Sequence, residues 1–252
     1  QRMKKYSIIS VVNNSYVKFA YVFVKSALEN LNLEHIHEIC LLDTGLDKKD
    51  KIKLSELNNK VKIISTEDKL NSAKSWDKGW QENVLLKTNF AYNYINDNKV
   101  PTCMIDIDSM IIKDLYEIVQ VNADAVICDR SDLWGGMPLI ASFVGFIDVN
   151  NSLEFIKVWR EKMNYMLDKG FKTRETPALN EIARHNKQFK LLGASHKIVG
   201  LYREDLEIEN TKIIHFKGAG DSEGKPMAEA INIRLNRFNK YGNKIKEYLK
   251  DV

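Results

Sequence analysis

The chain has 252 residues, of which 44% are hydrophobic and 29% charged, and its formal net charge is +4. This composition is ordinary for a globular protein and excludes a disordered or fibrous chain. The length suffices for one α/β domain or two small ones. The charge is compatible with an anionic small molecule but too small to indicate nucleic acid as a partner. No apolar stretch approaches the roughly 18 residues of a membrane-spanning helix.

The three cysteines, Cys40, Cys103 and Cys128, lie within apolar runs and have no paired spacing. An odd number without such spacing argues against a disulfide framework and favours a reducing compartment. The stretch "MKKYSIISVV" begins like a signal peptide, but its apolar run is short and no small-residue cleavage site follows. We therefore expect a cytoplasmic protein with buried, reduced thiols.

Apolar runs of strand length alternate with amphipathic, helix-length segments in the first half of the chain. The pattern predicts helices at 15–31, 47–57 and 80–96, and strands at 6–12, 37–43, 60–66, 102–108 and 124–129. Strands that are apolar on both faces and alternate with helices indicate an open, mostly parallel α/β sheet covered on both sides. Ligands of such sheets bind at the carboxyl ends of the strands. The polar residues at these predicted ends are Asn13, Asp43, Asp106, Asp108 and Asp129.

The second half predicts a strand at 139–150, helices at 152–168 and 175–185, and a short strand ending at His215. An amphipathic helix is expected from Met227 onward, with basic residues at Arg234, Arg237, Lys240, Lys244, Lys246 and Lys250. We expect a solvated face there, although contact with anionic lipid at the inner face of a membrane is an alternative. The organisation predicted is a single domain over 3–252, composed of 3–130, 131–226 and the C-terminal helix 227–252.

The stretch "CMIDIDSMIIKDL" (103–115) places Asp106 and Asp108 two residues apart in an apolar context. Residues i and i+2 of a strand point to the same face, so the two carboxylates can converge at its end. Two like charges held together are costly unless a cation lies between them, and carboxylate oxygens suit Mg²⁺ or Mn²⁺. The alternative is that the strand ends at Ile105 and both aspartates lie in a loop; the apolar context favours the metal site.

In "IIHFKGAG" (213–220), an apolar strand ends at His215 and is followed by Lys217 and two glycines. An imidazole can complete a carboxylate–metal site, and a Lys–Gly turn offers charge and amides to phosphate. A histidine at a strand end is more often only a hydrogen-bonded structural residue. The turn "VVNNSYV" (11–17) also has two interpretations. Tyr16 could stack on a base, or it could pack in the core.

Together these stretches resemble the nucleotide-sugar glycosyltransferases of the GT-A fold, most nearly glycosyltransferase family eight, the bacterial lipooligosaccharide galactosyltransferases and glycogenin. That family has a first strand, a polar turn, a tyrosine and a helix ending in Lys-Ser, as in "VVNNSYVKFAYVFVKS". It also has a D-x-D strand followed by an apolar run and Asp-Leu, as in "MIDIDSMIIKDL". Its H-x-x-G followed by Lys-Pro is matched by His215, Gly218, Lys225 and Pro226, and the similarity covers residues 6–226.

The resemblance implies transfer of a hexose-type sugar from a UDP-sugar donor to a saccharide or lipid-linked acceptor, with retention, as in bacterial polysaccharide or lipopolysaccharide biosynthesis. Mn²⁺ or Mg²⁺ would be bound by Asp106, Asp108 and His215. Catalytic roles would fall to Asp129, Glu175 and Lys217. Contacts with the donor, including stacking of Tyr16 on uracil, would come from Val12, Asn13, Ser15, Tyr16, Lys87, Asp106, Ile107, Gly218 and Lys225.

The chain departs from the family pattern at three places. The family's N-x-G before the fifth strand corresponds to Phe143-Val144-Gly145, so an amide that contacts the donor sugar is missing. The family's D-Q-D-x-L-N corresponds to "ETPALN" (175–180), where Glu175 keeps a carboxylate, Thr176 replaces the glutamine and Pro177 replaces the second acid. The Gly–Lys spacing near the C-terminus is also longer than usual, so Lys217 could substitute for Lys225. These changes leave the identity of the donor sugar and the stereochemistry of transfer open. The alternative to retention is an inverting enzyme in which Glu175 acts as the base.

Other functions are less consistent with the sequence. A sugar nucleotidyltransferase normally has a Gly-rich basic loop after its first strand, and "VVNNSYV" contains no glycine. A haloacid-dehalogenase-type phosphatase has its D-x-D at the start of the fold, whereas here it is at 106–108. A non-catalytic nucleotide-sugar-binding protein remains an alternative because of Phe143 and Thr176.

Three further features have a functional and a structural interpretation. His35 and His37 form an H-x-H without a third ligand nearby, so we expect a solvated loop rather than a metal site. The stretch 131–139 has the Gly- and Pro-containing composition of a mobile loop, in which Trp134 could stack on a sugar. Trp76 and Trp80 could form a carbohydrate platform, but packing against helices is slightly favoured.

Overall fold

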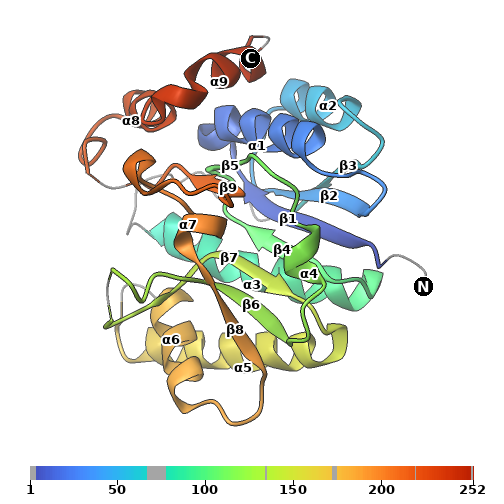
Figure 1. The fold of residues 1–252 in the computed structure, drawn as a ribbon, viewed down its shortest axis with the longest axis vertical. Helices are drawn as coiled ribbons and strands as arrows, with labels where there is room; N and C mark the ends of the chain where they lie inside the picture. The colour runs from blue at the N-terminus through green and yellow to red at the C-terminus, as the bar shows by residue number, and fades with distance from the viewer. Residues whose placement is uncertain (1–3, 67–77, 134, 172–174, 219, 251) are drawn as a thin grey trace.

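The computed structural model describes residues 4–66, 78–133, 135–171, 175–218, 220–250 and 252, with the backbone alone for 78–84. A seven-stranded sheet with strand order β3-β2-β1-β4-β7-β6-β8 forms its centre (Figure 1). Its strands are β1 (Tyr6–Val12), β2 (Ile36–Asp43), β3 (Val61–Ser65), β4 (Thr102–Ile105), β6 (Ala125–Asp129), β7 (Leu139–Phe146) and β8 (Leu191–Ser195).

All neighbouring strands of this sheet are parallel except β7, which is antiparallel to both β4 and β6. The C-terminal ends of β1, β4 and β6 therefore lie along the same edge. This arrangement confirms the expected mostly parallel α/β fold. It also brings together the segments that follow Val12, Ile105 and Asp129.

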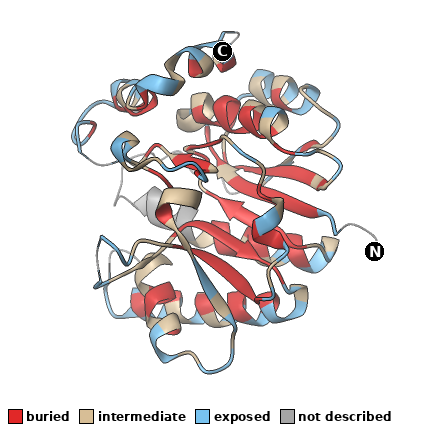
Figure 2. Ribbon diagram, viewed as in Figure 1, coloured by how far each residue is buried: buried red, intermediate tan, exposed pale blue. Residues whose placement is uncertain are grey.

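Helices cover both faces of the sheet. The core on one face includes side chains of α1 (Val17–Asn30), α2 (Lys48–Glu56), α4 (Tyr116–Val119) and α7 (His196–Val199). The core on the other includes α3 (Lys78–Asn98), α5 (Val149–Asp168) and α6 (Glu175–His185). Adjacent β1 residues illustrate the division, since Ile8 packs in the first core and Ile9 in the second. Figure 2 shows the strands largely buried, which explains their continuous apolar runs.

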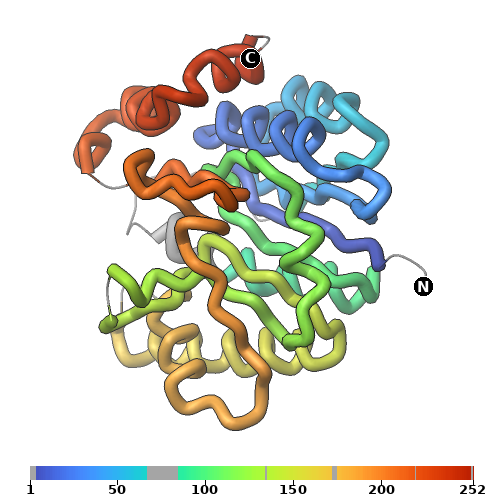
Figure 3. Tube along the Cα trace, viewed as in Figure 1, coloured from blue at the N-terminus to red at the C-terminus, as the bar shows by residue number. Residues whose placement is uncertain are grey.

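A small second sheet connects distant parts of the chain. Strand β5 (Ser109–Ile111) pairs antiparallel with β9 (Ile213–His215), and Ser109 lies opposite His215. Beside it, a third core joins Phe19 of α1 with side chains of α8 (Met227–Leu235) and α9 (Gly242–Tyr248). Figure 3 shows this C-terminal segment, in red, beside the blue α1. The pairing of β5 with β9 holds the C-terminal third of the chain next to the D-x-D.

Two predicted elements have other bounds in the structure, and one strand was not predicted. Strand β7 ends at Phe146, not 150, because Asp148 caps α5 by accepting a hydrogen bond from the Asn151 amide. Strand β8, sequence "LLGAS", was not predicted, because it is a partly exposed edge strand with a central glycine and no apolar run. The tail beyond Met227 forms two helices separated by a 3₁₀ turn over Asn239–Tyr241, not one helix.

The basic residues of this tail mostly contact the rest of the chain. Arg234 is buried, Lys240 pairs with Glu207 at 2.9 Å, and Lys244 pairs with Glu29 at 2.5 Å. Arg234 therefore contradicts the predicted solvated basic face, whereas the side chains of Lys240 and Lys244 are 61% and 35% exposed and agree with it. None of the described helices is long and apolar enough to cross a membrane.

The predicted state of the cysteines is confirmed. Cys40, Cys103 and Cys128 are buried and form no disulfide. Burial raises the pKa of each thiol to about 12, so all three are inert core residues.

Candidate functional site

The two aspartates of the D-x-D lie in a bend between β4 and β5. The prediction that one strand runs through Asp108 was wrong, because β4 ends at Ile105 and the following strand pairs with β9 instead. The bend is anchored on both sides. The Asp106 amide donates to the Ser142 carbonyl of β7 at 3.0 Å, and the Asp108 carbonyl accepts from the Phe216 amide at 2.8 Å.

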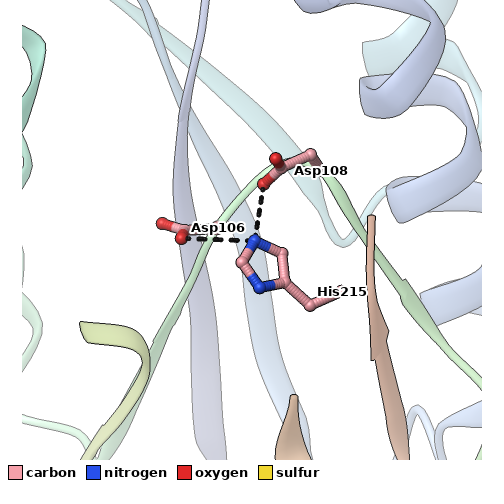
Figure 4. Close-up of side chains that lie close together, drawn as sticks. All are labelled: Asp106, Asp108 and His215. Carbon is pink, nitrogen blue, oxygen red and sulfur yellow. Dashed lines mark ion pairs between the residues drawn. The ribbon is translucent and has the colours of Figure 1, made fainter. Parts of the chain in front are cut away.

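The aspartate carboxylates nevertheless converge, together with His215 at the end of β9. His215 Nε2 lies 3.3 Å from Asp108 Oδ1 and 3.7 Å from Asp106 Oδ2. Figure 4 shows both carboxylates directed at this ring nitrogen. One potential ligand atom from each residue lies within 4.8 Å of the other two, and all three side chains are partly exposed. Two carboxylates and an imidazole are a donor set that fits Mn²⁺ or Mg²⁺.

Asp106 is also bound by a buried lysine from α3. Lys87 Nζ lies 2.6 Å from Asp106 Oδ1 and 2.7 Å from Glu175 Oε1, and it donates to the Ala141 carbonyl at 3.0 Å. Burial alone would lower the pKa of Lys87, but the two carboxylates outweigh burial and raise it. Trp159 Nε1 donates to the Glu175 carbonyl at 3.1 Å and so holds the start of α6 in place.

Glu175 shares the Lys87 charge with Asp106. Burial raises the pKa of Glu175 to about 7; Lys87 opposes this rise, and the negative charge of Asp106 adds to it. The single positive charge of the Lys87 ammonium lies between two negative carboxylates. It therefore does not fully compensate the charge of Glu175. A carboxyl group with a pKa near neutrality at the edge of an α/β sheet is a candidate for chemistry.

Asp108 is bound by Arg234 of α8, a residue expected on a solvated face. The Arg234 side chain is only 4% exposed and its Nη2 forms an ion pair with Asp108 Oδ2. Its Nε donates to the Phe216 carbonyl at 2.6 Å. Burial would raise the pKa of Asp108, but the charges of His215 and Arg234 outweigh it and hold the pKa at about 2.

A signal for Arg234 was present in the sequence. Ile231, Arg234, Leu235 and Phe238 recur at helical spacing and are all buried, so the arginine lies within the apolar stripe of its helix. A buried arginine requires an anionic partner, and the D-x-D supplies two acids in an apolar context in mid-chain. The assignment of Arg234 to the solvated face was therefore wrong.

The turn after β1 lies beside this cluster. Val12 ends β1, Asn13 is buried, and residues Asn14–Tyr16 form a 3₁₀ turn. The Tyr16 ring packs on Phe19 with centroids 5.6 Å apart. The Arg234 guanidinium lies 5.5 Å from the Tyr16 ring centre, and its Nη1 is 3.5 Å from the Tyr16 hydroxyl.

These contacts bring the predicted nucleotide turn next to the predicted metal ligands. Burial, with Asp108 nearby, raises the pKa of the Tyr16 phenol. Ser15 is partly exposed in the turn, and the side chain of Ile107 is buried in the core. Their contacts with a nucleotide remain predictions.

The predicted diphosphate residues separate into two groups. Lys217 is partly buried beside Tyr202, with its Nζ 5.2 Å from the ring centre, and burial and the neighbouring Arg130 lower its pKa. Gly218 adjoins the cluster, since a Cβ there would lie 3.6 Å from the Arg234 guanidinium carbon. Lys225 is exposed, and its Nζ lies 3.3 Å from Glu229.

Asp129 is the last residue of β6, and its side chain lies beside Gly193 of the neighbouring strand β8. Its Oδ1 accepts from the Ser131 amide at 2.8 Å, and a Cβ at Gly193 would lie only 2.5 Å from its Oδ2. Gly193 thus provides the space that the carboxylate occupies. Among the contacts described for this chain, none joins Asp129 to Lys87 or Glu175.

The register of β7 determines which of its residues lie beside the D-x-D. Phe143 lies opposite Ile105 and is fully buried, so Phe143–Gly145 is core. Ser142 is the residue bonded to Asp106, and the preceding Ala141 is bonded to Lys87. Ala141 and Ser142 therefore lie beside the D-x-D, whereas Phe143 packs in the core.

His35 stacks on Tyr116 with centroids 3.7 Å apart, and the Asp106–Asp108–His215 group is the one potential metal cluster found among the described residues. Residues Trp76 and Trp134 lie outside the described residues, as does the side chain of Trp80.

Searches against protein-family models and curated proteins gave no match. Solved structures do resemble this chain. An active-site mutant of LgtC matches with a TM-score of 0.68 and 10% identity over 97% of this chain and 95% of LgtC. The galactosyltransferase LgtC with donor and acceptor sugar analogs matches with a TM-score of 0.58 and 11% identity over 94% of this chain and 99% of that one.

A third likeness is to the glycosyltransferase GlyE of Streptococcus pneumoniae TIGR4, with a TM-score of 0.61 and 11% identity. It covers 96% of this chain and 64% of GlyE. The chain therefore has the GT-A fold of these glycosyltransferases, as the sequence resemblance implied.

Proposed function

We propose that this protein is a glycosyltransferase that moves a hexose-type sugar from a UDP-sugar donor to a saccharide or lipid-linked acceptor, with retention. The observation that carries the proposal is the convergence of Asp106, Asp108 and His215 at the carboxyl edge of a GT-A sheet. Sheets of this kind bind their ligands at that edge. LgtC, whose fold this chain shares, is a galactosyltransferase solved with donor and acceptor sugar analogs.

The metal proposed for the cluster is Mn²⁺ or Mg²⁺. When bound, the ion supplies positive charge that neutralises a departing diphosphate. Asp106, Asp108 and His215 would hold it, and Lys87 would keep the Asp106 carboxylate oriented.

The chain's own cations would also bind the donor. Lys217 lies two residues after His215, and both burial and Arg130 disfavour its charge, so a diphosphate beside it would relieve an unfavourable environment. Lys225 pairs with Glu229 on the exposed start of α8. We therefore favour Lys217 over Lys225 for the diphosphate, with the amide of Gly218 beside it and Tyr16 against the uracil.

Glu175 is the favoured catalytic carboxylate. It is connected through Lys87 to Asp106, whereas the described contacts of Asp129 are with Ser131 and the backbone at Gly193. In its ionised form Glu175 would stabilise positive charge developing at the anomeric carbon. Its pKa of about 7 makes this role dependent on pH, with the ionised form increasing as the pH rises.

Release of UDP from UDP-glucose, UDP-galactose and UDP-N-acetyl sugars, with Mn²⁺ and without it, tests the proposal. We expect turnover of at least one donor in Mn²⁺ and none after Asp108→Asn. Asp205→Asn is the matched control, because Asp205 is an exposed aspartate paired with Arg203. Turnover that survives Asp108→Asn would remove the metal role, and no turnover of any donor by the wild-type protein would contradict the proposed activity.

A further inference from the structure

Arg234 connects three segments that are far apart in the sequence. Its guanidinium pairs with Asp108 in the β4–β5 bend and donates to the Phe216 carbonyl after β9. It also lies 4.6 Å from the Phe19 ring centre and within 3.5 Å of the Tyr16 hydroxyl. One side chain from the C-terminal segment thus contacts both the predicted metal site and the predicted nucleotide turn.

The aspartates of the cluster each have one oxygen bound to a buried cation. Asp106 presents Oδ1 to Lys87 and Oδ2 to His215. Asp108 presents Oδ2 to Arg234 and Oδ1 to His215. The positive charge that two adjacent carboxylates require is therefore already supplied by the chain, and one oxygen of each remains directed toward the common point.

We infer that Arg234 is a positioning residue that serves as the resident counter-cation of the metal site and makes binding of the divalent ion depend on the nucleotide diphosphate. This inference rests on the proposed function. A fixed positive charge beside Asp108 weakens the attraction of the bare cluster for a divalent cation. The negative charge of a diphosphate offsets that repulsion, so the ion and the nucleotide bind strongly only together.

The same residue supports the nucleotide side of the site. The Arg234 guanidinium lies over the Tyr16 ring and beside Gly218. Its removal therefore eliminates its contact with the Tyr16 ring and its contact with Gly218. Replacing Arg234 with an uncharged side chain then has opposite effects on two ligands. The bare ion binds more tightly because Asp108 loses its fixed partner, while the nucleotide binds more weakly because Tyr16 loses its support.

Calorimetric titration of Arg234→Met with MnCl₂ alone, and with UDP in saturating Mn²⁺, tests this inference. We expect Mn²⁺ alone to bind about tenfold tighter than to the wild type. We expect UDP in Mn²⁺ to bind about tenfold more weakly, because the variant lacks the guanidinium that contacts the Tyr16 ring. Lys244→Met is the control, because Lys244 lies in the same C-terminal segment but pairs with Glu29 and Glu247; both affinities should be unchanged. Weaker binding of both ligands, or unchanged Mn²⁺ binding, would overturn the inference.

Arg234→Lys keeps the positive charge but loses the planar group that contacts the rings. We expect it to bind bare Mn²⁺ as the wild type does and to bind UDP more weakly. This result separates the effect of the charge from that of the ring contacts even where the methionine variant does not fold. Tighter Mn²⁺ binding by the lysine variant would exclude charge as the cause. If the wild type binds no UDP in Mn²⁺, the proposed function fails, whereas the titrations with Mn²⁺ alone still report on the counter-cation role.

Discussion

Replacing Lys87 with methionine removes the ammonium group between Asp106 and Glu175 while keeping an apolar stem of similar length. The Nζ lies 2.6 Å and 2.7 Å from the two carboxylates, and the side chain is 9% exposed. With an effective dielectric constant of about 20, each attraction amounts to about 6 kcal/mol before the cost of desolvation. Desolvation offsets much of this attraction, and breaking a buried pair typically costs about 3–5 kcal/mol. We expect a loss of unfolding free energy in that range above neutral pH.

The loss should shrink as the pH falls. The pKa of Glu175 is about 7 with Lys87 present, and removal of the ammonium raises it further. Because the folded variant then holds protons that the unfolded chain releases, its stability decreases as the pH rises through this range. Protonation at low pH removes the repulsion and restores part of the loss.

Urea unfolding of the wild type and Lys87→Met at a series of pH values measures both effects. Lys157→Met is the control, because Lys157 forms an exposed pair with Glu154 and its removal should leave the unfolding midpoint close to that of the wild type. A loss below about 1 kcal/mol for Lys87→Met above neutral pH, or a loss that does not change with pH, would refute the argument for a buried pair.

Two further substitutions test the electrostatics and the packing of the site. Glu175→Gln removes the carboxyl group whose folded pKa of about 7 exceeds its unfolded value, so wild-type stability should fall relative to the variant by up to about 3 kcal/mol as the pH rises from 4.5 to 7. Parallel stability profiles of the two proteins in urea would contradict this. Gly193→Ala places a Cβ 2.5 Å from Asp129 Oδ2 and should cost about 1–3 kcal/mol of stability. Asp129→Ala in the same chain removes the contact with Oδ2 but keeps a Cβ 3.0 Å away, so it should restore part of that loss. An unchanged melting temperature of Gly193→Ala would count against the close packing.

The sequence predicted those features of the fold that depend on local periodicity. Helix α6 spans Glu175–His185 and β1 spans Tyr6–Val12, as expected from their apolar patterns. Strand β8 was missed because its "LLGAS" lies at the sheet edge, and its place is determined by pairing with β6 rather than by burial. Periodicity reports which face of an element is buried, and an edge strand has little of that signal.

The site was predicted in part, and one argument for it was wrong. Asp106, Asp108 and His215 do converge, but through a bend and the β5–β9 pair, not along one strand. The partners of the aspartates required long-range information. Arg234 meets Asp108 across 126 residues, and the apolar stripe of its helix indicates that Arg234 is buried but does not identify Asp108 as its partner.

The central claim is that Asp106, Asp108 and His215 bind a divalent cation together with a uridine diphosphate. Anomalous diffraction at the manganese absorption edge, from crystals grown with MnCl₂ and UDP, tests it directly. The account predicts a manganese peak between these three side chains, with the diphosphate beside it. UDP bound without a manganese peak at the cluster, or manganese bound only elsewhere, would contradict it.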